Sequence, residues 1–167
     1  FFGKSLDNRS CYLALLRALE LTKGEELPVH VARLGSVQEE QGGLGALTGT
    51  YELHPDAALV ADVTFGDSPD SPRGYPFGSG AAIGYSPVLD RDLTRKLQAL
   101  AVQHQIPYVR EVMSGSTGTN SMHTQIAGDG VPASISRLMS ASRAYISVSA
   151  APRWKVTLSA MIAAARL

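Results

Sequence analysis

Strand-like and helix-like segments alternate along most of this chain, and that order limits the fold more than any other feature. Strand patterns, rich in β-branched and apolar residues, predict strands at 27–38, 57–65, 81–86, 107–113 and 131–138. Apolar residues at helical spacing predict helices at 9–22, 43–53, 90–105 and 151–167, with a short helix within 114–130. The expected fold is a single domain over 1–167, a three-layer α/β/α architecture with a mixed, mostly parallel sheet.

Composition excludes several classes of function. The chain has 15 basic and 15 acidic residues and no long basic run, so nucleic acid is an unexpected partner. No stretch is apolar and long enough to predict a bilayer span, so no membrane partner is expected. Cys11 is the single cysteine, which rules out an intramolecular disulfide and fits a reducing, cytoplasmic location. The abrupt start at Phe1, without a methionine, suggests a fragment of a longer protein.

Four acidic residues stand where predicted strands meet helices or turns. Glu39 and Glu40 follow the strand pattern at 27–38, Asp62 lies within the strand at 57–65, and Asp7 precedes the first helix. Open α/β sheets build their sites at the carboxyl ends of their strands, so these acids are expected to converge. Converging carboxylates repel unless a cation neutralises them, and this predicts a metal that activates water. One glutamate of the pair would bind metal and the other would act as general base.

Other readings of these acids stay open. Glu39 and Glu40 are also compatible with solvated loop positions, and Asp62 with a buried acid paired to an arginine. A pair of carboxylates is also the requirement of a glycosidase. The loop at 115–121 would be either an anion cradle or a plain loop before a helix. The histidines show no ligand spacing, and structural or surface roles are expected for them: His30, His54, His104 and His123.

Three blocks of the sequence carry a resemblance to a known family. They are "GKSLDNR" (Gly3–Arg9), "VQEEQGGLGA" (Val37–Ala46) and "ADVT" (Ala61–Thr64), and their order and spacing match. Together they resemble the tetrahedral (TET) aminopeptidases, dinuclear metallo-enzymes that include glutamyl aminopeptidases and endoglucanase-like relatives. The resemblance covers nearly the whole chain and implies a zinc-peptidase-like α/β/α fold.

The resemblance also implies roles for the acids. Asp7 would bridge two metals, Glu40 would bind one and Asp62 the other, while Glu39 would be the general base. The cofactor would be a divalent metal, zinc or cobalt with manganese possible, up to two per chain. The substrate would be a short peptide cleaved after its N-terminal residue. The expected partners are further copies of the chain in a homo-oligomer, or a second chain that completes the site.

The chain departs from the family pattern at several positions. The family completes each metal shell with a histidine, but no histidine follows His123, and Ser147 stands near the expected C-terminal position. Gly118 and Asn8 stand where the family usually has aspartates. The early histidine and the inserted dimerisation domain are expected to be missing with an absent N-terminal segment. Activity is therefore expected to be impaired in this chain alone, and the alternative is an inactive relative that serves assembly or binding.

Overall fold

The computed structural model describes residues 5–69, 72, 74–141 and 145–146 of the chain. The helix predicted at 151–167 lies outside the described residues. The helices are α1 (Leu6–Leu21), α2 (Leu44–Leu53), α3 (Arg91–Gln103) and α4 (Ser121–Thr124). The strands are β1 (Ala58–Phe65), β2 (Ala81–Tyr85), β3 (Tyr108–Val112), β4 (Ala133–Ala141) and β5 (Tyr145–Ile146).

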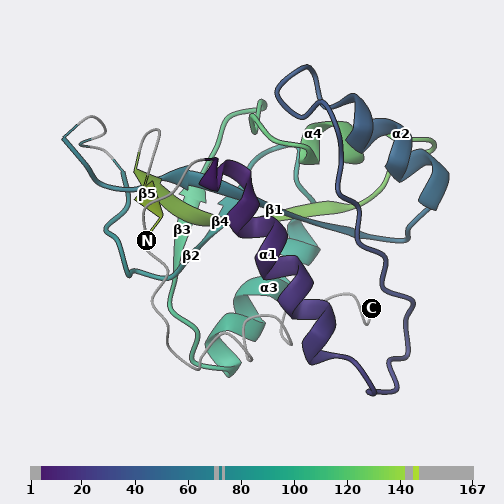
Figure 1. Cartoon of the computed structure of the whole chain (residues 1–167), viewed down its shortest axis with the longest axis horizontal. Helices are drawn as coiled ribbons and strands as arrows, with labels where there is room; N and C mark the ends of the chain where they lie inside the picture. Colours follow the sequence, from purple (N-terminus) through teal and green to yellow (C-terminus); the bar gives the residue numbers. More distant parts are fainter. Residues whose placement is uncertain (1–4, 70–71, 73, 142–144, 147–167) are drawn as a thin grey trace.

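The strands form one mixed sheet in the order β1-β4-β2-β3. β1 runs parallel to β4, with Ala58 paired to Ala133 and Phe65 to Ser140. β2 and β3 are also parallel to each other, whereas β2 and β4 are antiparallel. β5 pairs antiparallel with the end of β4. Figure 1 shows α2 and α4 on one side of the strands and α1 and α3 on the other, which confirms the α/β/α prediction.

The main apolar core lies between α3 and the sheet. Ile83 of β2 packs with Leu97 and Ala101 of α3, and all three are buried. Around them pack partly buried apolar side chains from β1, α3 and the segment leading into β3: Leu59, Leu100, Ile106 and Tyr108. This core fixes α3 against the face of the sheet that carries Leu59 and Ile83.

The opposite face of the sheet is tightly packed around Gly84. A Cβ atom at Gly84 would lie 2.3 Å from Cγ2 of Ile135 and 2.4 Å from Cε of Met113. Ile135 is fully buried. Glycine is therefore required at this point of β2, because any side chain would displace the packing of β4.

Most predicted elements are present, but the strand at 27–38 was wrong. That segment is irregular, and Gln38 at its end has a positive φ of 57°. A strand needs a neighbouring strand for its backbone hydrogen bonds, whereas side chains hold this segment instead. Arg33 lies over the ring of Tyr12 of α1 at 4.3 Å, and Ser36 accepts a hydrogen bond from Asn120. β5 is a strand that the sequence pattern did not predict.

Side-chain caps begin the two longest helices. Within α1, Asp7 and Asn8 have non-helical dihedral angles, so regular helix begins at Arg9 as predicted. Oδ1 of Asn8 accepts a hydrogen bond from the backbone N–H of Cys11, three residues on, at 3.3 Å. Asp90 caps α3, with its Oδ1 accepting a hydrogen bond from the N–H of Leu93 at 2.8 Å.

No helix in the described part of the chain is both long enough and apolar enough to cross a bilayer.

Replacement of the α3 cap provides a test of this fold. Asp90→Ala is expected to lower the free energy of unfolding by about 1 kcal/mol, because the N–H of Leu93 loses its acceptor. Asp92→Ala is the matched control, since Asp92 is an exposed acid in the same turn and pairs only with exposed Arg95. Its expected effect is below about 0.5 kcal/mol. Urea denaturation measures both, and equal losses in the two variants would contradict the capping role.

Candidate active site

Asp62 is the buried member of the predicted acids. It lies in β1, and its Oδ1 accepts hydrogen bonds from Nδ2 of Asn8 at 2.9 Å and from the N–H of Val63 at 2.8 Å. Both donors reach the same oxygen, so neither of these hydrogen bonds uses Oδ2. Burial raises the pKa of the Asp62 carboxyl to about 6, and the negative charges of Glu39 and Asp7 act in the same direction.

Contacts from α1 bring Asp7 to the same region. Asn8 donates to Asp62 and also to the backbone carbonyl of Ala61 at 3.2 Å, so the start of α1 is tied to β1. One turn further on, the Cys11 thiol donates to the carbonyl of Asp62 at 3.0 Å. Burial raises the pKa of that thiol to about 12, which makes it a packed group and not a nucleophile. Asp7 itself is exposed.

Glu39 and Glu40 lie in a tight turn that leads into α2. The N–H of Gly43 donates to the carbonyl of Gln38 at 2.9 Å and to that of Glu39 at 3.2 Å. Glu39 is half-buried and Glu40 is exposed. The pKa of Glu39 is raised, first by burial and then by the charges of Glu40 and Asp7. Positive charge at His123 and Arg137 acts in the opposite direction.

His123, for which we expected a structural or surface role, packs against this turn. A Cβ atom at Gly43 would lie 2.0 Å from Cδ2 of the His123 ring, and Gly43 has a φ of +61°. Glycine is therefore required here on two grounds, since a side chain would be strained and would also clash. His123 is half-buried, and it is the histidine whose charge influences Glu39. His30, His54 and His104 are exposed.

The charges of the predicted acids influence Glu39 and Asp62, but the acids are not gathered into one ligand group. Among the described residues, no three histidine, cysteine, aspartate or glutamate side chains form a group that could hold a metal ion. The donor chemistry fits a divalent cation, because carboxylate oxygens are suitable ligands and burial leaves Asp62 with a raised pKa. The described residues therefore fit the carboxylate part of a metal site and do not complete its ligand shell.

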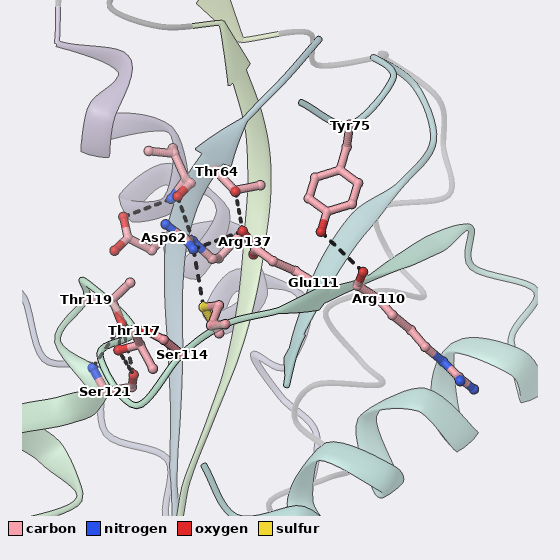
Figure 2. Close-up of polar contacts among 12 residues, drawn as sticks. Asp62, Thr64, Tyr75, Arg110, Glu111, Ser114, Thr117, Thr119, Ser121 and Arg137 are labelled. Atoms are coloured by element: carbon pink, nitrogen blue, oxygen red, sulfur yellow. Dashed lines mark hydrogen bonds and ion pairs between the residues drawn. The ribbon is translucent and has the colours of Figure 1, made fainter. Parts of the chain in front are cut away.

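A second polar network lies beside Asp62 on the same face of the sheet, and the sequence did not predict it. Arg137 of β4 is the register partner of Asp62 in the parallel β1–β4 pair. Its Nε donates to the carbonyl of Val63 at 2.7 Å, and its Nη1 to Oε1 of Glu111 at 3.1 Å. The hydroxyl of Thr64 also donates to that Oε1. Figure 2 shows Arg137 between Asp62 and Glu111.

The Arg137–Glu111 ion pair is largely buried, with side chains 13% and 10% exposed. Oε2 of Glu111 is buried and has no hydrogen-bond partner among the described residues. The interpretation of Asp62 as an acid paired to an arginine was half right, because an arginine lies beside it but pairs with another acid. The available signal was an arginine inside the strand pattern at 131–138, whose register with β1 the sequence does not specify.

The loop before α4 carries a compact cluster of hydroxyl groups. Thr117, Thr119 and Ser121 are all buried, and their hydroxyl oxygens lie 2.9–3.2 Å from one another. Figure 2 shows the three side chains turned toward each other. These hydroxyl groups use one another as hydrogen-bond partners. This favours the interpretation of the segment as a plain loop before a helix, and not as an anion-binding loop.

Comparisons with known proteins agree with the fold and the motifs. The family model described as M42 glutamyl aminopeptidase matches residues 1–149. A lysyl aminopeptidase of Pyrococcus furiosus is 29% identical over 132 residues, which cover 78% of this chain and 38% of that protein. The chain thus spans well under half of the length of this relative.

Solved structures give the same picture. A TET aminopeptidase from a marine sediment archaeon of the Thaumarchaeota is 26% identical, with a TM-score of 0.83 over 99% of this chain and 49% of that one. PhTET1-12s, solved as a dodecamer in the asymmetric unit, shares the fold at 23% identity, with a TM-score of 0.62 over 81% of this chain and 41% of that one. Aminopeptidases of the M42 family depend on divalent metals. The predicted resemblance to TET aminopeptidases is confirmed, and the chain belongs to the M42 glutamyl aminopeptidase family.

Proposed function

We propose that this chain provides the carboxylate part of a metal-dependent aminopeptidase site. The observation that carries the proposal is the shared electrostatic environment of acids from three segments. The charges of Glu39 of the turn before α2 and Asp7 of α1 help to raise the pKa of Asp62 of β1, and the charge of Asp7 also helps to raise that of Glu39. Excess negative charge of this kind is stabilised by a cation. Family membership gives the reaction class, hydrolysis at the N-terminus of a peptide.

In this proposal the residues that would hold divalent metal are Asp7, as the shared ligand, with Glu40 and Asp62 as the individual ligands. The hydrogen bonds from Asn8 and Val63 hold Oδ1 of Asp62, which leaves Oδ2 as the oxygen for a cation. A bound divalent cation would supply Lewis acidity, polarising a water and the substrate carbonyl. Zinc and cobalt are the favoured ions, with manganese as a third candidate.

Glu39 has the properties of the proton acceptor. It is half-buried, and its raised pKa moves toward the neutral range in which a general base works best. We propose that Glu39 takes a proton from the attacking water and later passes it to the departing amine.

A second function is a relative without catalytic activity that serves assembly or binding. Two observations favour it. The described residues do not form a group of three metal ligands, and a buried arginine lies beside Asp62. For catalysis, further ligands would have to come from outside the described residues of this chain, for example from a partner copy.

Single substitutions of the acids are expected to distinguish a metal ligand, which affects metal affinity, from the general base, which affects the rate of hydrolysis. Asp62→Asn is expected to weaken binding of Zn²⁺ or Co²⁺ at least tenfold, because a ligand charge is lost. Glu39→Gln is expected to leave metal affinity within about threefold and to lower hydrolysis of an aminoacyl p-nitroanilide at least about a hundredfold. Calorimetric metal titration and a chromogenic assay measure the two effects.

The control for these variants is Asp56→Asn, which changes an exposed acid next to α2. Metal binding that depends on Asp62 without any hydrolysis would support the inactive relative. Metal affinity unchanged in Asp62→Asn would contradict the proposed site.

The raised pKa of Asp62 also predicts how stability depends on pH without metal. The folded-state pKa of about 6 exceeds the unfolded value of about 3.9, so the folded form favours the protonated acid. The contribution of protonated Asp62 to the free energy of unfolding is fully present below about pH 3.9 and is lost as the pH rises through about 6. Asp62→Asn is therefore expected to raise the free energy of unfolding by about 3 kcal/mol at pH 7.5 relative to the parent chain, and by little at pH 4.

Urea denaturation in a chelating buffer at pH 4, 6 and 7.5 measures this difference. The exposed variant Asp56→Asn should change stability equally at the three pH values. A constant difference between Asp62→Asn and the parent chain would contradict the assignment of the charge penalty to Asp62.

We also propose that the chain associates with further copies of itself. Four large apolar side chains are 45–64% exposed on α2 and just after α4: Leu44, Tyr51, Leu53 and Ile126. Figure 1 shows these two helices side by side. Light scattering is expected to give a multiple of 17.7 kDa, and Ile126→Asp should reduce it. Val102→Asp on α3, equally exposed, is the control; a monomeric parent chain would refute the association.

A further inference from the structure

Arg137 holds a positive charge next to the acid that we propose as a metal ligand. Parallel strands keep register partners on the same face, so the side chains of Asp62 and Arg137 leave the sheet together. The hydrogen bond from Nε of Arg137 to the carbonyl of Val63, 2.7 Å long, holds the guanidinium against β1. The arginine is only 13% exposed, so solvent screens its charge weakly.

The ion pair with Glu111 does not cancel the effect of Arg137 on the acids. Arg137 lies on β4, which adjoins β1, whereas Glu111 lies on β3 at the other end of the strand order. Figure 2 shows Arg137 between Asp62 and Glu111, so the positive member of the pair faces the acid. In agreement with this geometry, the charge of Arg137 lowers the pKa of Asp62 and of Glu39.

We propose that Arg137 is a built-in counter-charge which weakens the binding of divalent cations at the carboxylates of Asp62 and its neighbours. The inference rests on the proposed metal site. A fixed positive charge repels an incoming divalent cation. It also neutralises part of the negative charge that attracts the cation. Within a partly buried face the effect is about tenfold or more in affinity. Arg137 thus sets how much metal the site retains at a given free concentration.

The arginine also has a structural role, so the test has to separate charge from packing. Arg137→Met alone would leave Glu111 buried without a partner, which is strongly destabilising. The double variant Arg137→Met/Glu111→Gln removes the two charges together and keeps both side chains at similar length. Arg137→Lys retains the positive charge and loses the planar fork of donors.

Arg110→Met is the matched control. Arg110 lies on β3, next to Glu111 in the sequence, and its guanidinium stacks over Tyr85 at 5.8 Å from the ring centroid. Figure 2 shows its side chain directed away from Asp62 and Arg137. This variant removes the same charge from the same protein at a position away from the proposed ligands.

The experiment is calorimetric titration of the whole chain with Mn²⁺ at pH 7.5, with circular dichroism to verify folding. The double variant is expected to bind Mn²⁺ at least about tenfold more tightly than the parent chain, while Arg137→Lys and Arg110→Met stay within about threefold of it. An unchanged affinity in the double variant would overturn the inference, as would an equal gain in Arg110→Met.

Failure of the inference can be told apart from failure of the proposed function. Adding Asp62→Asn to the parent chain and to the double variant should weaken Mn²⁺ binding at least about tenfold in both. If Asp62→Asn weakens binding but the double variant binds no more tightly than the parent, the metal site stands and the role of Arg137 is refuted. If Asp62→Asn has no effect on either protein, both proposals fail.

Discussion

The parallel pairing of β1 with β4 is the constraint on which the rest of this structure depends. Eight consecutive register pairs join Ala58–Phe65 to Ala133–Ser140. The helices attach to these two strands by specific polar contacts. Asn8 and Cys11 tie α1 to β1, and Thr94 of α3 lies 3.0 Å from Ser134 of β4 between their hydroxyl oxygens. A shift of one residue in this register would turn Asp62 away from Arg137 and move every anchor to the opposite face.

The distribution of charge follows from that pairing. The acids of α1 and of the turn before α2 lie close enough to disfavour ionisation of Asp62 in β1. One arginine faces them from the adjacent strand and is already shared with Glu111. A buried ion pair contributes little net stability in most proteins, because desolvation offsets the attraction. Its presence beside the acids is therefore better explained by its effect on their charge than by its contribution to folding.

Much of the fold could be predicted from the sequence because the signals were local. Helix caps at Asn8 and Asp90, the apolar run of β1 and the glycine-rich turn after Glu40 all act over a few residues. The segment 27–38 was mistaken for a strand because β-branched residues indicate extended backbone but not a partner for it. Asp7, Glu39, Glu40 and Asp62 were proposed from their places at predicted strand ends and before the first helix, and the three matching blocks added a role for each. Arg137 and Glu111 were missed because their pairing depends on register across three strands, which no local pattern specifies.

The irregular segment before Glu39 gives the two halves of the proposed site different stiffness. Asp62 belongs to a strand whose backbone is hydrogen-bonded to β4 throughout, so moving it requires breaking the sheet. Glu39 and Glu40 follow an irregular segment that is held by side-chain contacts. These are the cation–π contact of Arg33 with Tyr12 and the hydrogen bond from Asn120 to Ser36. Such contacts open at a lower free energy than a sheet does. The protein therefore holds Asp62 in a rigid strand, whereas Glu39 and Glu40 lie in a segment that can move more easily.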